Sequence, residues 1–338
     1  MLNNQTVFIS GGTGSFGRAF VKHVINKYKK IKRLVIFSRD EFKQFEMSKI
    51  FPSKKYPFLR YFLGDVRDLS RLKYALKEID IVIHAAALKH VPAAEYNPFE
   101  FIKTNVLGAQ NIIDASIANN VRNVIALSTD KAVSPVNLYG ATKLCSDKLF
   151  ISANNIIGNN PTIFSIVRYG NVMSSRGSVI PYFLMLKKNK KKLQLTDINM
   201  TRFHITLEQA VNTVIWSINN CLGGEIVVNK ISSIKLLDLV KALKSDYEII
   251  GIRPGEKIHE ELLQAAESPY TLELKNFYVI VNNYKKNDKI FSYYKKNFFA
   301  RFVPENFSYN SLQNNFLSLN QIRAEIIKSK ISGNINFF

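Results

Sequence analysis

The chain has 338 residues, of which 46% are hydrophobic and 22% charged, a composition typical of a globular protein with one large α/β core and a smaller domain. No apolar run approaches the about 18 residues that cross a bilayer, and no signal peptide leads the sequence. The two cysteines, Cys145 and Cys221, lack the spacing of a metal site. The composition therefore favours a reduced, cytoplasmic setting over a secreted or membrane one.

The formal net charge of +21 raises the question of nucleic-acid binding. The lysines are scattered along helices and loops among abundant Asn and Ile, so biased codon usage explains them more simply. A basic surface also suits a polyanionic small substrate. We therefore expect a small-molecule ligand, and neither nucleic acid nor a membrane as partner.

The first predicted strand, residues 6–10, runs directly into a glycine-rich turn, Gly11-Gly-Thr-Gly14-Ser-Phe-Gly17, and an amphipathic helix follows over about residues 18–29. Glycines at these positions suit a tight turn, close approach to a pyrophosphate and close helix–strand packing, with the phosphates at the helix N-terminus. The spacing differs from the commoner Gly-x-Gly-x-x-Gly. The strand before the turn and the helix after it therefore make this a predicted dinucleotide site.

Short apolar strands alternate with helices over the first half of the chain, which predicts the α/β class and a Rossmann-type doubly wound parallel sheet. The further strands are expected at residues 33–37, 58–63, 80–84, 123–128 and 162–167, and a long helix at about 99–119.

The pattern changes after about residue 172, where the segments become shorter and more mixed. Strands are expected at 193–195 and 225–228, and helices at 207–219 and 234–243. We predict a dinucleotide-binding domain at 1–172 and a smaller α/β substrate-binding domain at 173–338, some segments of which could return to the first domain. The lysine-rich run 187–192 is expected to be a solvated face or loop, and the tail beyond residue 282 is placed only coarsely.

The polar residues that follow the strand at 123–128 are the best candidates for chemistry. The strand leads into Thr129, Asp130 and Lys131, and a helix beginning after Pro135 carries Tyr139 and Lys143. A spacing of four places Tyr139 and Lys143 on one helix face, where an ammonium is expected to lower the pKa of the phenol and make it a base near neutral pH. Asp130 and Lys131 could otherwise merely cap the turn.

The residues after the second strand bear on cofactor choice. An NAD-preferring enzyme places a carboxylate at this strand end to bind the ribose hydroxyls, whereas here Ser38 and Arg39 follow Phe37. Arg39 can pair with a 2′-phosphate and Ser38 can donate to it, which favours NADP. Arg39 could equally be a surface residue, with Asp40 as the N-cap of the next helix.

The motifs together resemble those of the extended short-chain dehydrogenase/reductases, and more closely those of the inverting UDP-N-acetylglucosamine 4,6-dehydratases that start pseudaminic acid synthesis. The resemblance covers roughly residues 3–325. It is carried by the segments 10–17, 37–41, 64–68, 84–92, 128–131, 139–143, 168–172 and 252–257. Several of these are general to the superfamily. Thr129-Asp-Lys131 together with Ile252-Arg-Pro-Gly-Glu-Lys257 is the specific part, because retaining relatives carry Thr-Asp-Glu where this chain has Thr129-Asp-Lys131.

The resemblance implies a redox-neutral dehydration. Tyr139 would take the 4-hydroxyl proton as C4 is oxidised, with Thr129 and Lys143 holding the site. The C4 ketone makes the C5 proton acidic, so that Lys131 can remove it while Asp130 protonates the leaving 6-hydroxyl. Lys131 can be this base only if its pKa is depressed, as desolvation and neighbouring cations predict.

The resemblance also implies the ligand contacts. The expected NADP-binding residues are Gly11, Thr13, Gly14, Ser15, Phe16, Gly17, Ser38, Arg39, Asp65, Val66, Ala85, Ala86, Lys89, Asn105, Tyr139 and Lys143. The expected residues for UDP-N-acetylglucosamine are Lys89, Asn171, Val179, Thr196, Arg202, Arg253 and Glu256, of which the two arginines suit the diphosphate and Glu256 the ribose. No metal is expected, and a homo-oligomer, a hexamer in the resembled enzymes, is implied.

Two alternatives stay open. One is a sibling dehydratase or nucleotide-sugar epimerase serving capsule or other surface polysaccharides. The other is a non-catalytic protein that binds NADP or nucleic acid, against which the intact Thr129, Tyr139 and Lys143 argue.

Overall fold

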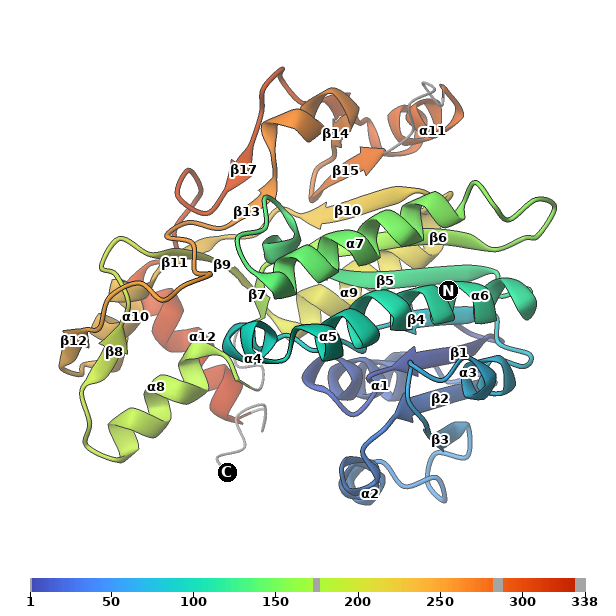
Figure 1. Ribbon diagram of the computed structural model, residues 1–338, viewed down its shortest axis with the longest axis horizontal. Helices are drawn as coiled ribbons and strands as arrows, with labels where there is room; N and C mark the ends of the chain where they lie inside the picture. Colours follow the sequence, from blue (N-terminus) through green and yellow to red (C-terminus); the bar gives the residue numbers. More distant parts are fainter. Residues whose placement is uncertain (1, 173–176, 282–287, 332–338) are drawn as a thin grey trace.

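A ten-stranded sheet forms the centre of the protein, and six of its strands, between residues 6 and 169, are those that the alternation of apolar strands and helices predicts (Figure 1). The computed structural model describes residues 2–172, 177–281 and 288–331. From one edge to the other the strands are β16 (Arg301–Phe302), β14 (Thr271–Glu273), β15 (Phe277–Val281), β10 (Glu225–Asn229), β6 (Ile163–Tyr169), β5 (Asn123–Thr129), β4 (Ile81–His84), β1 (Thr6–Ser10), β2 (Arg33–Ser38) and β3 (Leu59–Leu63).

The strand order reverses at β1, which is the feature that places a ligand site in such sheets. The chain runs from β1 out to β2 and β3, then crosses back so that β4 pairs with the other side of β1. The strands from β10 to β3 are all parallel, so their carboxyl ends lie along one edge. In sheets of this kind ligands bind at the edge where the order reverses, so the ends of β1 and β4 are the expected place for the predicted dinucleotide.

Helices cover both faces of the sheet, which is why its central strands are continuously apolar. Figure 1 shows α6 and α7 in front of the sheet and α9 behind it, and α9 packs against α1. The helices of this layer arrangement are α1 (Ser15–Lys27), α2 (Glu41–Ile50), α3 (Leu69–Ala75), α4 (Val91–Tyr96), α5 (Pro98–Phe101), α6 (Gly108–Ala118), α7 (Leu138–Ala153) and α9 (Leu207–Asn220).

The predicted elements agree with the structure in type but not everywhere in extent. The helix expected at 99–119 contains a π-helical segment, η1 (Ile102–Leu107), between α5 and α6. The helix expected from residue 234 begins at Leu236, because residues 233–235 pair as β11 with β9. The first helix begins at Ser15, three residues before the expected start, so it opens inside the glycine-rich turn.

The chain returns to the sheet after residue 172. β10 adds in parallel to β6, and β15, β14 and β16 extend that edge in antiparallel fashion. The remaining elements are β7 (Asn171–Val172), α8 (Val179–Lys188), β8 (Leu193–Leu195), β9 (Thr201–Ile205), β11 (Ser233–Lys235), α10 (Leu236–Leu243), β12 (Tyr247–Ile249), β13 (Glu261–Leu263), η3 (Ala265–Tyr270), α11 (Asp288–Phe298), β17 (Tyr309–Asn310) and α12 (Leu319–Ile331).

A second, smaller hydrophobic core lies beside the carboxyl ends of the parallel strands. It is built by apolar residues of α8, β8, α10 and α12, among them Phe183 and Leu239. Figure 1 shows these elements gathered at the end of the sheet where α7 begins. The lysines of the run 187–192 are exposed on this lobe, as predicted. Within the described ranges, no helix combines the length and apolarity that a membrane span requires.

Candidate active site

The glycine-rich turn after β1 fits the pyrophosphate of a dinucleotide. Gly11 has a φ of +65°, and a Cβ there would lie 2.8 Å from the Cα of Ala86. A Cβ at Gly17 would lie 2.1 Å from the carbonyl oxygen of Gly12. Side chains are thus excluded at both positions because the turn packs closely against the protein's own backbone, and the N-cap of α1, Gly14, makes no side-chain capping bond. The first N–H groups of α1 are therefore suited to phosphate oxygens.

A buried pair fixes the segment that follows β4. Ser10 Oγ accepts hydrogen bonds from the backbone N–H groups of Ala85 and Ala86, each at 3.2 Å, and lies 2.9 Å from His84 Nδ1. Because these two amides use the lone pairs of the hydroxyl, Ser10 donates its proton to His84. Burial, with a smaller effect of Lys143, lowers the pKa of His84 to about 3, so the imidazole is neutral. Ala85 and Ala86 are held against the glycine turn as a result.

The residues expected at the ribose lie together at the ends of β2 and β3. Arg39 keeps about half of its side chain exposed, and its guanidinium lies 3.8 Å from Asp65 Oδ2. Asp65 is held more closely by Arg67, at 2.8 Å. Burial raises the pKa of Asp65, but hydrogen bonds from Arg67 outweigh burial and lower it overall. Asp40 caps α2 through Lys43 N at 2.9 Å, so the structural role considered for Asp40 is confirmed.

Two of the expected cofactor contacts, Asn105 and Val66, also serve the packing of the protein, and their roles at the cofactor stay predictions. The side-chain amide of Asn105 exchanges hydrogen bonds of 2.9 Å with both backbone groups of Leu88 and donates to Thr142 Oγ1 at 3.0 Å. Asn105 thereby ties the segment after β4 to α7. Val66 is buried against Gly108, at the start of α6. Desolvation and the charge of Lys131 lower the pKa of Lys89, which follows β4.

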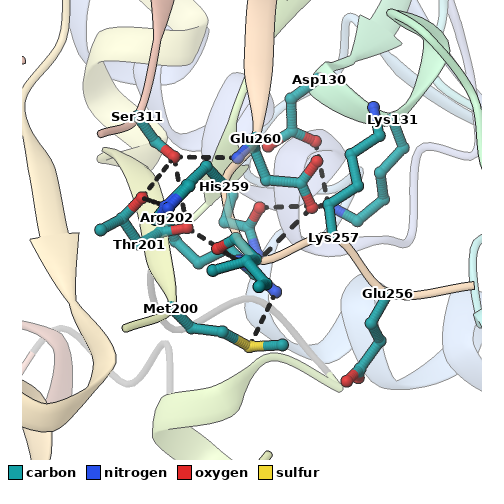
Figure 2. Close-up of polar contacts among 12 residues, drawn as sticks. Asp130, Lys131, Met200, Thr201, Arg202, Glu256, Lys257, His259, Glu260 and Ser311 are labelled. Atoms are coloured by element: carbon teal, nitrogen blue, oxygen red, sulfur yellow. Dashed lines mark hydrogen bonds and ion pairs between the residues drawn. The ribbon is translucent and has the colours of Figure 1, made fainter. Parts of the chain in front are cut away.

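The end of β5 brings the predicted acid–base residues together. Lys131 Nζ lies 2.9 Å from Asp130 Oδ1 and donates to Asn171 Oδ1 at 3.3 Å. Thr129 Oγ1 donates to the same Asp130 oxygen at 2.9 Å. A second carboxylate, Glu260, also contacts Lys131, at 3.0 Å (Figure 2).

The pKa of Lys131 differs from the prediction. Burial lowers it, but the carboxylates of Asp130 and Glu260 outweigh burial, so the pKa is raised above the usual lysine value. The predicted depression of this pKa is wrong, because the sequence does not reveal that two buried acids flank the amine. The ammonium is the resting form of Lys131.

Tyr139 and Lys143 lie on α7, which packs tightly against the turn after β5. Asn137 caps the helix by accepting from Gly140 N at 2.8 Å. Burial raises the pKa of Tyr139 to about 12, and the largest opposing effects are the charge of Lys131 and a hydrogen bond with Thr129. The prediction that Lys143 lowers this pKa to near neutral is therefore wrong. Lys143 is buried, and desolvation lowers its own pKa against the charge of Asp147.

A chain of buried charges supports α7 from behind. Asp147, one turn beyond Lys143, accepts from Ser128 Oγ at 2.6 Å and lies 3.8 Å from the guanidinium of Arg168. Arg168 in turn pairs with Glu267 at 3.0 Å. These groups hold the strand ends of β5 and β6 to α7.

The residues expected at the nucleotide sugar divide into two sets. Arg202 is mostly buried beside Glu260, with its Nε 3.9 Å from Glu260 Oε1, and donates to the carbonyls of Thr201 and Ile258 at 2.7 and 2.9 Å. Arg253 and Glu256 instead pair with each other, at 2.9 Å, and Figure 2 shows Glu256 directed away from the Lys131 group.

Two other residues, Thr196 and Val179, are also expected to contact the sugar. Thr196 is buried and donates to Met200 Sδ at 2.9 Å, and Val179 opens α8. The sugar-binding roles of these residues stay predictions.

Sequence reasoning missed Glu260. It lies three residues beyond the Ile252–Lys257 motif, close enough for the motif to have directed attention to it. Nothing local shows that its side chain is buried against Lys131, because the contact joins residues 129 positions apart.

A Rossmann-type sheet with a glycine turn after β1, and with Thr129, Tyr139 and Lys143 at β5 and α7, defines an extended short-chain dehydrogenase/reductase. The chain belongs to the polysaccharide biosynthesis protein family, whose model matches residues 7–282. The class inferred from the motifs is thereby confirmed.

Individual relatives extend over nearly the whole chain. The sequence is 50% identical over 332 residues to the UDP-N-acetylglucosamine 4,6-dehydratase (inverting) of Campylobacter jejuni subsp. jejuni serotype O:2, which covers 97% of this chain and 98% of that protein. It is 41% identical over 288 residues to the UDP-glucose 4-epimerase of Rickettsia canadensis, covering 83% and 84%. The X-ray structure of Pen from Bacillus thuringiensis matches with a TM-score of 0.88 at 37% identity, covering 98% of this chain and 99% of that one.

Proposed function

We propose that this protein is a configuration-inverting UDP-N-acetylglucosamine 4,6-dehydratase that uses NADP and catalyses the first step of pseudaminic acid synthesis. The observation that carries the proposal is the Asp130–Lys131 pair, joined at 2.9 Å beside Tyr139. A simple epimerase of this fold oxidises and reduces C4 and has no use for a second acid–base pair there. The 50% identity with the Campylobacter jejuni inverting dehydratase supports the same reading.

The glycine turn, Ser38, Arg39 and the segment of Ala85 and Ala86 would hold the cofactor, and the excluded Cβ positions at Gly11 and Gly17 fit its close approach. A bound nicotinamide would supply the acceptor for the hydrogen on C4 and return it to C6. NADP is favoured over NAD by Arg39, whose exposed guanidinium can pair with a 2′-phosphate.

Tyr139 must first lose its own proton to solvent, and as a phenolate it then takes the proton of the 4-hydroxyl as C4 is oxidised. The phenol is hydrogen-bonded with Thr129 and close to the positive charge of Lys131, and both favour the phenolate that forms when the tyrosine passes a proton on. Lys143 is buried one turn further along α7, where desolvation lowers its pKa against the charge of Asp147. The ketone at C4 then makes the proton on C5 removable.

Asp130 and Lys131 perform the elimination. Lys131 first passes a proton to Asp130 along their 2.9 Å hydrogen bond, a shift that leaves the net charge of the buried group unchanged. The amine then takes the C5 proton while the Asp130 carboxylic acid protonates the 6-hydroxyl, the C6–O bond breaks and water leaves. Both residues are then back in their starting forms. When the hydrogen from C4 returns to C6, C5 takes a proton from solvent on the opposite face.

The product would be UDP-2-acetamido-2,6-dideoxy-β-L-arabino-hex-4-ulose. NMR of a reaction with UDP-N-acetylglucosamine tests the proposal, because the configuration at C5 distinguishes an inverting from a retaining dehydratase. A C4 epimer with an intact 6-hydroxyl would instead establish an epimerase, the activity named for the Rickettsia relative. Binding of the cofactor or of RNA without any turnover would establish a non-catalytic protein. We further propose a cytoplasmic homo-oligomer, a hexamer by resemblance.

A further inference from the structure

The group at the end of β5 contains one ammonium and two buried carboxylates. Glu260 Oε1 lies 3.0 Å from Lys131 Nζ, about as close as Asp130 Oδ1 at 2.9 Å. The side chains of Asp130 and Glu260 are 1% and 3% exposed, so water can stabilise neither charge. A single ammonium can neutralise only one of them, and an uncompensated buried carboxylate is unfavourable.

The surroundings of the two acids decide which one stays ionised. Glu260 has a second cation, Arg202, whose Nε lies 3.9 Å from the same oxygen that faces Lys131. Asp130 has Lys131 as its one ion-pair partner among the described residues. The second oxygens of both acids, Asp130 Oδ2 and Glu260 Oε2, are buried there without a hydrogen-bond partner, so the difference between the acids lies in Arg202. Asp130 is therefore the acid better suited to hold a proton.

The pKa directions agree with this geometry. Burial raises the pKa of Asp130, and the charge of Glu260 raises it further against the opposing charge of Lys131. Burial also raises the pKa of Glu260, but Lys131 and Arg202 outweigh burial and lower it overall. The two neighbouring carboxyl groups therefore differ in how readily each holds a proton, Asp130 more readily and Glu260 less.

We propose that Glu260 is a positioning residue for the dehydration: it is the permanent counter-ion of Lys131 and so leaves Asp130 free to carry the proton that the leaving 6-hydroxyl receives. This inference rests on the proposed function. Glu260 stays ionised throughout the cycle, while the proton that Lys131 passes to Asp130 departs with the 6-hydroxyl as water. The C5 proton restores the Lys131 ammonium, which Glu260 stabilises as it forms.

The backbone of Glu260 is anchored independently of its carboxylate. Its N–H donates to Ser311 Oγ at 2.9 Å, and its carbonyl accepts from Ser311 N at 2.8 Å. Ser311 Oγ also lies 2.7 Å from Thr201 Oγ1, next to Arg202 (Figure 2). The segment after β17 thus positions both Glu260 and Arg202, and Glu260→Gln can remove the charge without releasing the main chain.

The test follows the titration of Asp130 itself. Carbon-13 NMR of protein with labelled aspartate reports the carboxyl group, identified by its loss in Asp130→Asn. The other charged or titratable groups that act on Asp130 are Lys131, Glu260, Lys257 and Tyr139. In Glu260→Gln, Asp130 becomes the only anionic partner of Lys131, so we expect it to titrate at lower pH than in the wild-type protein. The matched control is Glu261→Gln, which removes a carboxylate that accepts a hydrogen bond from Ser134 Oγ at 3.3 Å. This variant should leave the titration of Asp130 unchanged.

Activity provides the second readout. Elimination needs the Asp130–Lys131 pair to share a single proton, so activity should decline as pH falls through the Asp130 pKa and both residues become protonated. Glu260→Gln should move this acid-side decline to lower pH. Because Asp130 then holds a proton less readily, the transfer from Lys131 also becomes less favourable. At neutral pH we expect turnover to fall at least about tenfold, with C4 oxidation retained and partial recovery in Glu260→Asp. An Asp130 titration that does not move in Glu260→Gln overturns the proposal, even if activity falls. If the wild-type protein yields no 4-keto sugar, the proposed function fails, whereas the titration still decides whether Glu260 controls Asp130.

Discussion

Gly140 lies so close to Lys131 that a Cβ on it would be 2.2 Å from the Lys131 carbonyl oxygen. The first turn of α7 can therefore rest directly on the turn after β5, and this contact places Tyr139 beside Thr129. Gly140 directly follows Tyr139 in the sequence. The position of the Tyr139 phenol therefore depends on how closely α7 approaches the turn after β5.

Gly140→Ala should separate α7 from this turn. Because neither backbone can yield cheaply, we expect a loss of roughly 1–3 kcal/mol in the free energy of unfolding and a larger proportional loss of turnover. Thermal unfolding and product formation measure the two effects. Ser152→Ala, on the exposed part of the same helix, should change neither. Full activity in Gly140→Ala would show that the close contact does not position Tyr139.

Tyr139→Phe removes one oxygen and should leave the fold intact. General acid–base catalysis contributes about 10²–10⁴-fold, so turnover should fall by at least that range while cofactor affinity is retained. Turnover assays and NADP titration of the same preparation test this. Near-normal activity would mean that another group accepts the 4-hydroxyl proton.

Arg39→Ala should weaken binding of NADP more than binding of NAD, since only NADP has the 2′-phosphate. Calorimetric titration with both cofactors gives the comparison. Lys49→Ala, exposed on α2, is a control for general loss of positive charge. An equal loss for NAD and NADP would reject the role of Arg39.

Turnover in heavy water should place one solvent deuterium at C5, whereas the hydrogen that arrives at C6 should come from C4 of the substrate. Lys131→Ala should stall after C4 oxidation, because no amine remains to take the C5 proton. Lys191→Ala, in the exposed lysine run, should behave as wild type. NMR of the products measures the label, and normal labelling in Lys131→Ala would place the base elsewhere.

Acid should destabilise the protein through His84. Its pKa is 6.5 in an unstructured chain and about 3 in the fold. The unfolded chain therefore binds a proton that the native state refuses, and the free energy of unfolding should fall as pH drops from about 6.5 towards about 3. In His84→Asn, which retains an acceptor for Ser10, the free energy of unfolding should fall less on acidification than in the wild type. In His90→Asn, at an exposed position, it should fall as much as in the wild type. Melting temperatures across this pH range provide the measurement, and equal declines in wild type and His84→Asn would contradict the assignment.

Local sequence was sufficient for the six strands from β1 to β6 and for the first half of the site, but it did not place β10, β14, β15 and β16 in the same sheet. The strands from β1 to β6 follow from short apolar runs, and the glycine turn, Asp130, Lys131 and Tyr139 follow from motifs confined to a few neighbouring positions. The chemistry of such segments is visible in the sequence because the strand order of a doubly wound sheet brings their ends to one edge.

Only the tertiary structure decided the protonation of the site. Whether Lys131 is a free base or an ammonium depends on Glu260, which reaches it from a segment 129 residues further along the chain. The pKa of Tyr139 likewise follows from burial rather than from its helical spacing to Lys143. Electrostatic energies depend on distance in space and on desolvation, and a sequence pattern records neither for residues that meet only when the chain folds.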